Sequence, residues 1–210
     1  MNKKIGMIGA IINAVTVFLF ALFMLIDFIV GSYFVCILLS FSFIMMIGGL
    51  YSECSIKNRT AGIIGLAFGA IYSTLIVIVY YTQCTTVLNE QLSGDAEKIL
   101  NYKYMSLMFN LDILGYGIMA LSTFFIGLTV NVNNKIDKAL KILLLVHGIF
   151  FISCLIMPMT GMFINESGSN SKGGIIALEM WCLYFLPIGI LSFLHFKNKG
   201  IGENYEDSSN

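Results

Sequence analysis

The sequence predicts an all-α integral membrane protein, built as a bundle of six transmembrane helices. Three observations support this: six long apolar runs, a low content of charge, and the concentration of that charge between the runs. Hydrophobic residues make up 58% of the 210 positions and charged residues 11%, and the mean hydropathy is +0.86. A soluble domain needs a charged surface, and this chain has too few charges to cover one.

The apolar runs are long enough for helices that cross a bilayer. A hydrocarbon core of about 30 Å requires about 20 helical residues, and backbone groups in lipid must be hydrogen-bonded within the segment. Barrel strands would be shorter and would alternate in polarity, which these runs do not. The predicted helices cover residues 5–26, 33–50, 61–82, 105–130, 139–159 and 174–196. They form one bundle over residues 1–196, followed by a short cytoplasmic tail at 197–210.

The first two runs form the predicted N-terminal hairpin. Lys3 and Lys4 precede the first run, as basic residues do in a signal peptide. The run is too long for one, and no A-x-A-type cleavage site follows it, so we interpret it as a retained helix. The second run begins after a tight turn near Gly31 and Ser32.

The third run carries a stripe of glycines. Gly62, Gly65 and Gly69 recur at spacings of three and four, so they share one helix face. Small residues let helix backbones approach closely in lipid, which makes these three candidate helix-packing positions. Tyr80 and Gln83 continue the stripe toward the other end of the helix.

The last three runs contain the ionisable residues Asp112, His147 and Glu179. At 1.5 Å per residue, Asp112 lies about 10 Å and Glu179 about 8 Å from the outer helix ends. Asp27 lies near the same edge of the membrane. A charge at such a depth costs several kcal/mol unless it meets water, a partner or a proton.

Basic residues predict the orientation, because Lys and Arg accumulate in cytoplasmic loops. With the N-terminus inside, the outer face holds only Lys98, Lys103 and Lys172. The inner face holds Lys3, Lys4, Lys57, Arg59, Lys135, Lys138, Lys141, Lys197 and Lys199. We therefore expect both termini to be cytoplasmic.

The acidic residues of the outer third suggest a pocket that opens outward. Its candidate lining residues are Asp27, Tyr80, Gln83, Asp112, Tyr116 and Glu179. Such a lining would suit a small cation, an amine or protons. In the alternative interpretation, Asp27 and Glu179 reach the interface and Asp112 only hydrogen-bonds a neighbouring helix.

Other polar and aromatic side chains call for separate interpretations. His147 is either a proton-relay residue or, as we favour, a neutral histidine donating to a backbone or Asn13-type partner. His195, at the inner end of the last run, needs no special role. Trp181 lies about 200° around the helix from Glu179, at 100° per residue, so it is expected to face lipid.

Several function classes lack a signal in the sequence. The five cysteines are odd in number and include no C-x-x-C pair, so we expect neither a disulfide framework nor a metal site. Motifs for zinc proteases, serine hydrolases and P-loop proteins are absent, as is a basic patch for nucleic acid. We expect no catalytic residue, no cofactor and no nucleic-acid partner. The lipid bilayer is the predicted environment.

Two stretches of sequence carry a family resemblance. Residues 59–65 read RTAGIIG, and residues 138–141 read KALK before the fifth run. In layout they resemble uncharacterised six-helix bacterial membrane families of this length, which implies the six-helix architecture alone. Abundant Ile, Asn and Lys with a single Arg are typical of an AT-rich bacterial genome, so a bacterial cytoplasmic membrane is the expected location.

The sequence leaves two main hypotheses for function. In the first, the protein binds or transports a small solute or cation through the outer acidic pocket. In the second, it is a non-catalytic accessory or structural protein whose polar residues hold helices together. Asp112 discriminates between them, because its depth is the hardest to explain without a partner.

Overall fold

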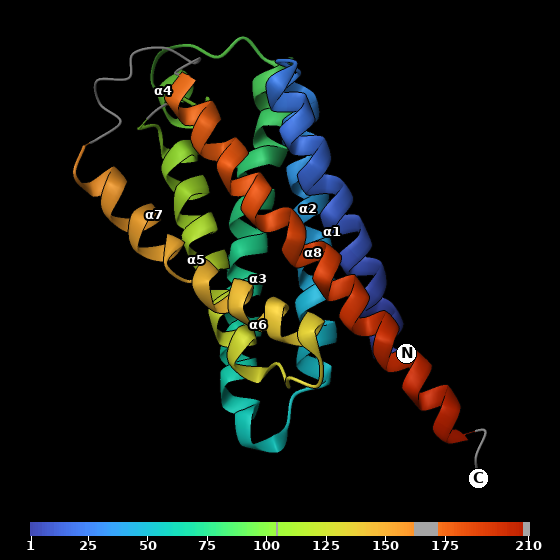
Figure 1. Ribbon diagram of the computed structural model, residues 1–210. Helices are drawn as coiled ribbons and strands as arrows, with labels where there is room; N and C mark the ends of the chain where they lie inside the picture. The colour runs from blue at the N-terminus through green and yellow to red at the C-terminus, as the bar shows by residue number, and fades with distance from the viewer. Residues whose placement is uncertain (104, 162–171, 208–210) are drawn as a thin grey trace.

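The computed structural model describes residues 1–103, 105–161 and 172–207, with side chains described up to Asn198 and from Gly174 in the last segment. These residues form helices and no strand (Figure 1). The helices are α1 (Asn2–Leu25), α2 (Ile29–Ser52), η1 (Ile56–Asn58), α3 (Arg59–Thr82), η2 (Gln83–Val87), α4 (Gly94–Leu100), α5 (Leu107–Thr129), α6 (Lys135–His147), α7 (Phe150–Met159) and α8 (Lys172–Asp207).

Six helical spans in the described residues are long and apolar enough to cross a membrane. Four of them are α1, α2, α5 and the Gly174–Asn198 part of α8. The other two are composite: Ile56–Val87 joins η1, α3 and η2, and Lys135–Met159 joins α6 and α7. The all-α class with six spanning helices is therefore confirmed for the described chain.

Three helices differ in extent from the sequence prediction. α2 begins at Ile29 rather than at residue 33, so Gly31 and Ser32, predicted to form the tight turn, lie in its first turns instead. The predicted helix over 139–159 is interrupted between His147 and Phe150, where backbone N–H groups bond three residues back rather than four. Gly148 stands at this break, and a Cβ there would lie 2.9 Å from the Cβ of Phe124. The last helix, α8, continues to Asp207, into the segment predicted to be a tail.

The helices pack in a connected order around a shared core. α1 pairs with α2, α2 with α3, and α3 with α5, while α8 closes the bundle against α1 and α6. α7 packs against α5 and leans away from α8 (Figure 1). Both chain termini lie at one end of the bundle, which we call the terminal end. The α1–α2 turn and α4 lie at the opposite end.

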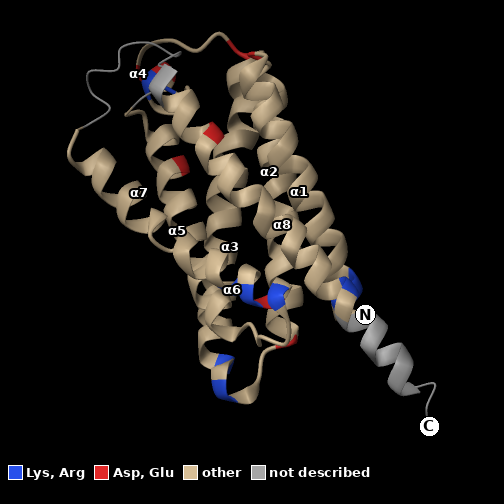
Figure 2. Ribbon diagram, viewed as in Figure 1, with Lys and Arg blue, Asp and Glu red and all other residues tan. Residues whose placement is uncertain are grey.

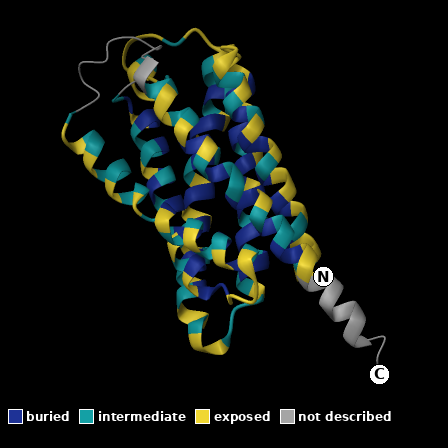
Figure 3. Ribbon diagram, in the orientation of Figure 1, coloured by how far each residue is buried: buried dark blue, intermediate teal, exposed yellow. Residues whose placement is uncertain are grey.

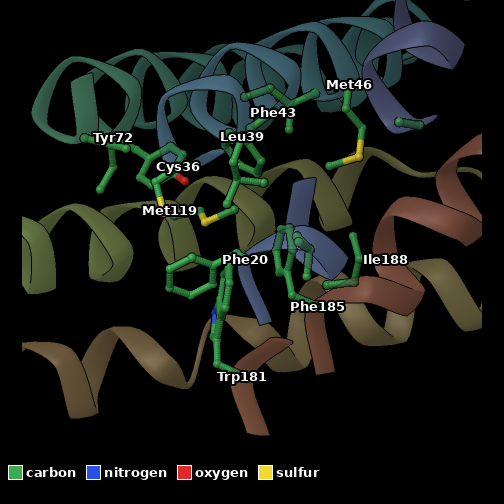
Figure 4. Close-up of a cluster of buried hydrophobic side chains, with 14 of the residues drawn as sticks. Phe20, Cys36, Leu39, Phe43, Met46, Tyr72, Met119, Trp181, Phe185 and Ile188 are labelled. Carbon is green, nitrogen blue, oxygen red and sulfur yellow. The ribbon is translucent and has the colours of Figure 1, made fainter. Parts of the chain in front are cut away.

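Buried aromatic and aliphatic side chains fill the centre of the bundle. Phe43 of α2 contacts Tyr72 of α3 edge-on, with ring centroids 5.1 Å apart, and lies 6.4 Å from Phe185 of α8. Figure 4 shows these rings converging with residues of α1 and α5. Figure 3 shows the exposed residues on the outside of the helices, where large apolar side chains such as Phe18, Phe41 and Leu183 face outward. Such a surface is stable in lipid rather than in water.

Glycines mark the closest helix contacts. A Cβ at Gly9 of α1 would lie 2.6 Å from the backbone N of Met46 on α2, so only glycine allows this approach. The three glycines of the α3 stripe are likewise buried at contacts. Gly62 faces Tyr51, Gly65 faces Ile126, and Gly69 faces Ile47.

Charged side chains are concentrated near the two ends of the bundle. Figure 2 shows most Lys and Arg at the terminal end, in the first turn of α1, the α2–α3 connection and the start of α6. Lys98 and Lys103 lie at the opposite end, beside acidic partners. Acidic residues that lie away from the ends, such as Asp112, are therefore the exceptions that the bundle must accommodate.

Candidate functional site

Asp112 is a buried carboxyl group on α5, in the half of the bundle opposite the chain termini. Its exposed fraction is 3%. The hydroxyl of Tyr102 donates to Asp112 Oδ2 over 2.7 Å. Among the described residues, no hydrogen-bond donor reaches Asp112 Oδ1. A buried carboxyl oxygen without a partner is rare, because the desolvation cost is not repaid.

Tyrosine rings surround this carboxyl group. Tyr33, Tyr80 and Tyr102 come from α2, α3 and the segment after α4, and their ring centroids are 5.4, 5.8 and 6.2 Å apart in pairs. Tyr80 stacks on Tyr102, the residue whose hydroxyl bonds to Asp112. Aromatic faces carry partial negative charge and attract cations, so the cluster adds to the pull of the carboxylate.

Tyr116 belongs to the adjoining layer, one helical turn along α5. Its hydroxyl lies 3.7 Å from Cys36 Sγ, and its ring lies 5.8 Å from Tyr72 and 5.0 Å from Trp181. The Tyr72 hydroxyl is buried with no hydrogen-bond partner among the described residues. The layer next to the Asp112 cluster therefore contains a second buried polar group without a partner, the Tyr72 hydroxyl.

Tyr102 is held over Asp112 by Gln83. Gln83 Nε2 donates to the Leu100 carbonyl over 2.8 Å, and Gln83 Oε1 accepts from the Tyr102 backbone N–H at 3.1 Å. The wide turn η2 begins at Gln83 and ends the regular part of α3. We call residues 94–103, which comprise α4 and the three residues after it, the outer strap. None of the residues of α4 is buried.

The ionisation state of Tyr102 is fixed by its surroundings. Burial and the nearby Asp112 carboxyl group raise the pKa of Tyr102 well above its ordinary value. The hydroxyl therefore stays protonated and acts as the donor in its bond to Asp112.

Asp27 and Glu179 are separate from the Asp112 cluster. Asp27 is exposed in the α1–α2 turn and has a left-handed backbone, with φ 57°. Glu179, on α8, is half-buried, and its Oε1 has no hydrogen-bond partner among the described residues. Of the predicted pocket residues, Tyr80, Gln83 and Asp112 each contact Tyr102. Tyr116 lies one helical turn from Asp112 on α5 and contacts Tyr72 and Cys36 instead. Among the described residues, no hydrogen bond or ring contact links Asp27 or Glu179 to these four residues.

His147 lies at the break between α6 and α7 and has hydrogen-bond partners on both ring nitrogens. Its Nε2 accepts from Trp181 Nε1 at 3.2 Å, and its Nδ1 lies 2.7 Å from Thr123 Oγ1. An indole N–H is only a donor, so Nε2 carries no proton and Nδ1–H donates to Thr123. Thr123 in turn donates to the Ala120 carbonyl over 2.9 Å. A neutral imidazole thus satisfies every group in this chain of bonds.

The His147 contacts correct one prediction and qualify another. Trp181 does not face lipid: it is 8% exposed, stacks on Phe185 at 5.0 Å and points into the core (Figure 4). Asn13 is fully buried on α1, but its amide atoms have no hydrogen-bond partner among the described residues. The partners of His147 are therefore Thr123 and Trp181.

His195 joins three segments near the terminal end, contrary to the expectation that it needs no special role. Its Nδ1 lies 2.6 Å from Asp137 Oδ1 at the start of α6, and its Nε2 lies 3.0 Å from Glu53 Oε2 in the α2–α3 connection. Sequence reasoning missed this cluster because the partners are 58 and 142 residues away. The available signal was that all three residues stand at the ends of apolar runs.

All five cysteines are free thiols. Among the described residues, no group of three or more His, Cys, Asp or Glu side chains has an arrangement that could hold a metal ion. No known family model, curated protein or solved structure shows significant similarity to this chain. The function is therefore inferred from the geometry of the site.

Proposed function

We propose that this protein binds and transports a small cation or amine, and that Asp112 is the binding residue. The observation that supports this is the buried carboxyl group whose Oδ1 lacks a partner among the described residues. The distribution of Lys and Arg supports a topology with both termini in the cytoplasm. In that topology, Asp112 lies in the outer half of a bacterial cytoplasmic membrane.

The physical argument is one of charge compensation. An ionised carboxylate at this depth costs several kcal/mol unless a proton or a cation offsets it. No Lys, Arg or His is hydrogen-bonded to Asp112 among the described residues. A proton and a cation therefore compete for the same carboxyl group, and cation binding weakens as the pH falls. The surrounding tyrosine rings favour a weakly hydrated cation such as an ammonium ion.

The outer strap sets the route to this site. Tyr102 occupies one oxygen of Asp112 and is itself held by the Gln83 bonds and by its ring contacts. Displacement of the strap would open Asp112 to the outer surface. Gly94, the first residue of the strap, and Met105, two residues after its end, both have left-handed backbones, with φ 60° and 64°.

A thermal-shift series with purified protein in lipid nanodiscs tests the proposal. Ammonium, methylammonium, tetramethylammonium, sodium and potassium chlorides serve as probes at constant ionic strength. Because a ligand stabilises the state that binds it, at least one probe should raise the melting temperature of the wild type. Asp112→Asn should abolish that shift. Asp27→Asn, which removes an exposed carboxylate at the same end, should keep it.

Flux of the active probe into proteoliposomes separates transport from binding alone. If no probe distinguishes the wild type from Asp112→Asn, the cation site is excluded. The accessory or structural function then remains, which the close ring contacts around Asp112 also favour. A reporter fused to the C-terminus that proved to be extracellular would overturn the proposed topology.

A further inference from the structure

The cluster of Glu53, Asp137 and His195 near the terminal end is independent of the Asp112 site. Asp137 is 1% and His195 3% exposed, whereas Glu53 reaches the surface in part. Asp137 lies in the first turn of α6, His195 lies on α8, and Glu53 follows α2. One imidazole therefore links three parts of the fold through its two ring nitrogens.

The remaining bonds of Asp137 fix its position. Asp137 Oδ2 accepts from the Asn133 backbone N–H and from Asn134 Nδ2, both at 3.0 Å. Asn134 also caps α6, because its Oδ1 accepts from the Asp137 backbone N–H. Asp137 Oδ1 is thereby directed at His195 Nδ1.

Counting protons shows what the cluster requires. Each nitrogen–oxygen pair needs one proton to be a hydrogen bond, so the two pairs need two. A neutral imidazole between two carboxylates supplies only one. If the second proton is absent, two acceptors face each other across 3.0 Å, at His195 Nε2 and Glu53 Oε2. The observed geometry therefore requires two protons, which is one more than a neutral histidine between two ionised carboxylates carries.

We infer that Glu53, His195 and Asp137 form a proton-binding site that fastens the terminal end of the bundle. The bound proton is shared between His195 Nε2 and Glu53 Oε2, the pair nearest the surface. Its loss separates the α2–α3 connection from α8. The site acts as a latch that is closed when the proton is bound and released as the pH rises.

Among the residues whose side chains the structure describes, the other charged groups at this end are cationic. Among the described residues, Glu53 and Asp137 are the titratable groups that interact with His195. Lys141 of α6 donates to the Val130 carbonyl over 3.0 Å. The remaining cations are Lys3 and Lys4 on α1, Lys57 on η1, Arg59 on α3, Lys135 and Lys138 on α6, and Lys197 on α8. These charges oppose the extra proton, so the short contacts of His195 with the two carboxylates must retain it.

Nitrogen NMR of histidine tests the inference directly, because the chain has only two histidines. In ¹⁵N-histidine-labelled protein in nanodiscs, His147 should keep one unprotonated Nε2 throughout the titration and serve as the internal reference. At about pH 6, the extra proton should appear on His195 Nε2 or on the ¹³C-labelled carboxyl group of Glu53, and it should leave as the pH is raised. The inference is overturned if, at about pH 6, His195 is neutral and both carboxyl groups are ionised.

Thermal stability provides the second measurement. The melting temperature of the wild type should fall by about 2–4 °C as the proton leaves, which is the shift expected for one lost hydrogen bond in a chain of this size. Glu53→Gln should abolish this fall, because its amide N–H can donate to Nε2 without a bound proton. Glu90→Gln, at an exposed position, should leave the fall unchanged. An unaltered pH profile in Glu53→Gln would contradict the shared proton. If that variant fails to fold, the NMR measurement on the wild type decides alone.

Discussion

The two buried aspartates of the described chain have opposite hydrogen-bonding environments. Asp137 accepts bonds from a backbone N–H, an asparagine amide and an imidazole, so both of its oxygens are occupied. Asp112 accepts one bond, from Tyr102, and its second oxygen has no hydrogen-bond partner among the described residues. Their exposed fractions, 1% and 3%, are nearly equal.

Burial therefore does not distinguish these two carboxyl groups, whereas hydrogen-bond satisfaction does. A fully partnered carboxylate has recovered its lost hydration through fixed donors and has no oxygen left for a ligand. A carboxylate with one unpartnered oxygen is still stabilised by binding a proton or a cation. The same reasoning makes His147 structural, because each of its ring nitrogens already has a partner.

The largest expected effect comes from Asp137→Ala. This change leaves the Asn133 N–H and the His195 imidazole without an acceptor in a buried site. The free energy of unfolding should fall by about 3–5 kcal/mol, as for the loss of one partner from a buried charged pair. SDS titration in mixed micelles measures it. Asp95→Ala, in an exposed pair with Lys98, is the matched control and should change little. An equally small effect at Asp137 would show that its bonds do not stabilise the fold.

An intermediate effect is expected from Tyr102→Phe, which removes the single bond to Asp112. If Asp112 is ionised, the loss should be about 1.5–3 kcal/mol, the range for a hydrogen bond to a charged group. The same substitution should cost less in an Asp112→Asn background, because the pair is coupled. Tyr81→Phe, at an exposed neighbouring ring, is the control. Additive losses in the double variant would show that the Tyr102 hydroxyl does not act through Asp112.

A smaller effect on stability is expected from Asp112→Asn alone. The amide oxygen can still accept from Tyr102, and the substitution removes the need to compensate a buried charge. The free energy of unfolding should change by no more than about 1 kcal/mol and could rise. The comparison is sharpest when Asp137→Asn is measured beside it, since that amide cannot reproduce all the acceptor contacts of Asp137. A large loss at Asp112 would instead favour the structural function.

The sequence was sufficient to predict the six apolar spans, because lipid imposes their length and composition. It predicted less well which side chains face inward. Apolar residues suit both the core and the lipid face, so the helical spacing from Glu179 misplaced Trp181. The break at His147 depends on partners in α5 and α8, and no local pattern carries that information. Asp112 was identifiable because a carboxyl group at that depth needs compensation whatever the fold. The hydrogen bond from Tyr102 to Asp112 depends on the conformation of the outer strap, which no local sequence pattern specifies.

The smallest effect should occur at Glu97, an exposed carboxylate that completes the comparison. Lys103 Nζ lies 2.6 Å from Glu97 Oε1, and this hydrogen bond and charge lower the pKa of Glu97 from its ordinary value. A lowered pKa means that any stabilisation is present above the ordinary pKa and is lost as the pH falls through the lowered one. Lys103→Met should therefore return the pKa of Glu97 toward its ordinary value, as carboxyl NMR can measure, while the melting temperature near neutral pH stays unchanged. Solvent and salt screen an exposed pair, whereas Asp112 and Asp137 are shielded from both. A clear loss of stability in Lys103→Met would mean that the outer strap depends on this pair, and that Gln83 and Tyr102 do not suffice to hold it over Asp112.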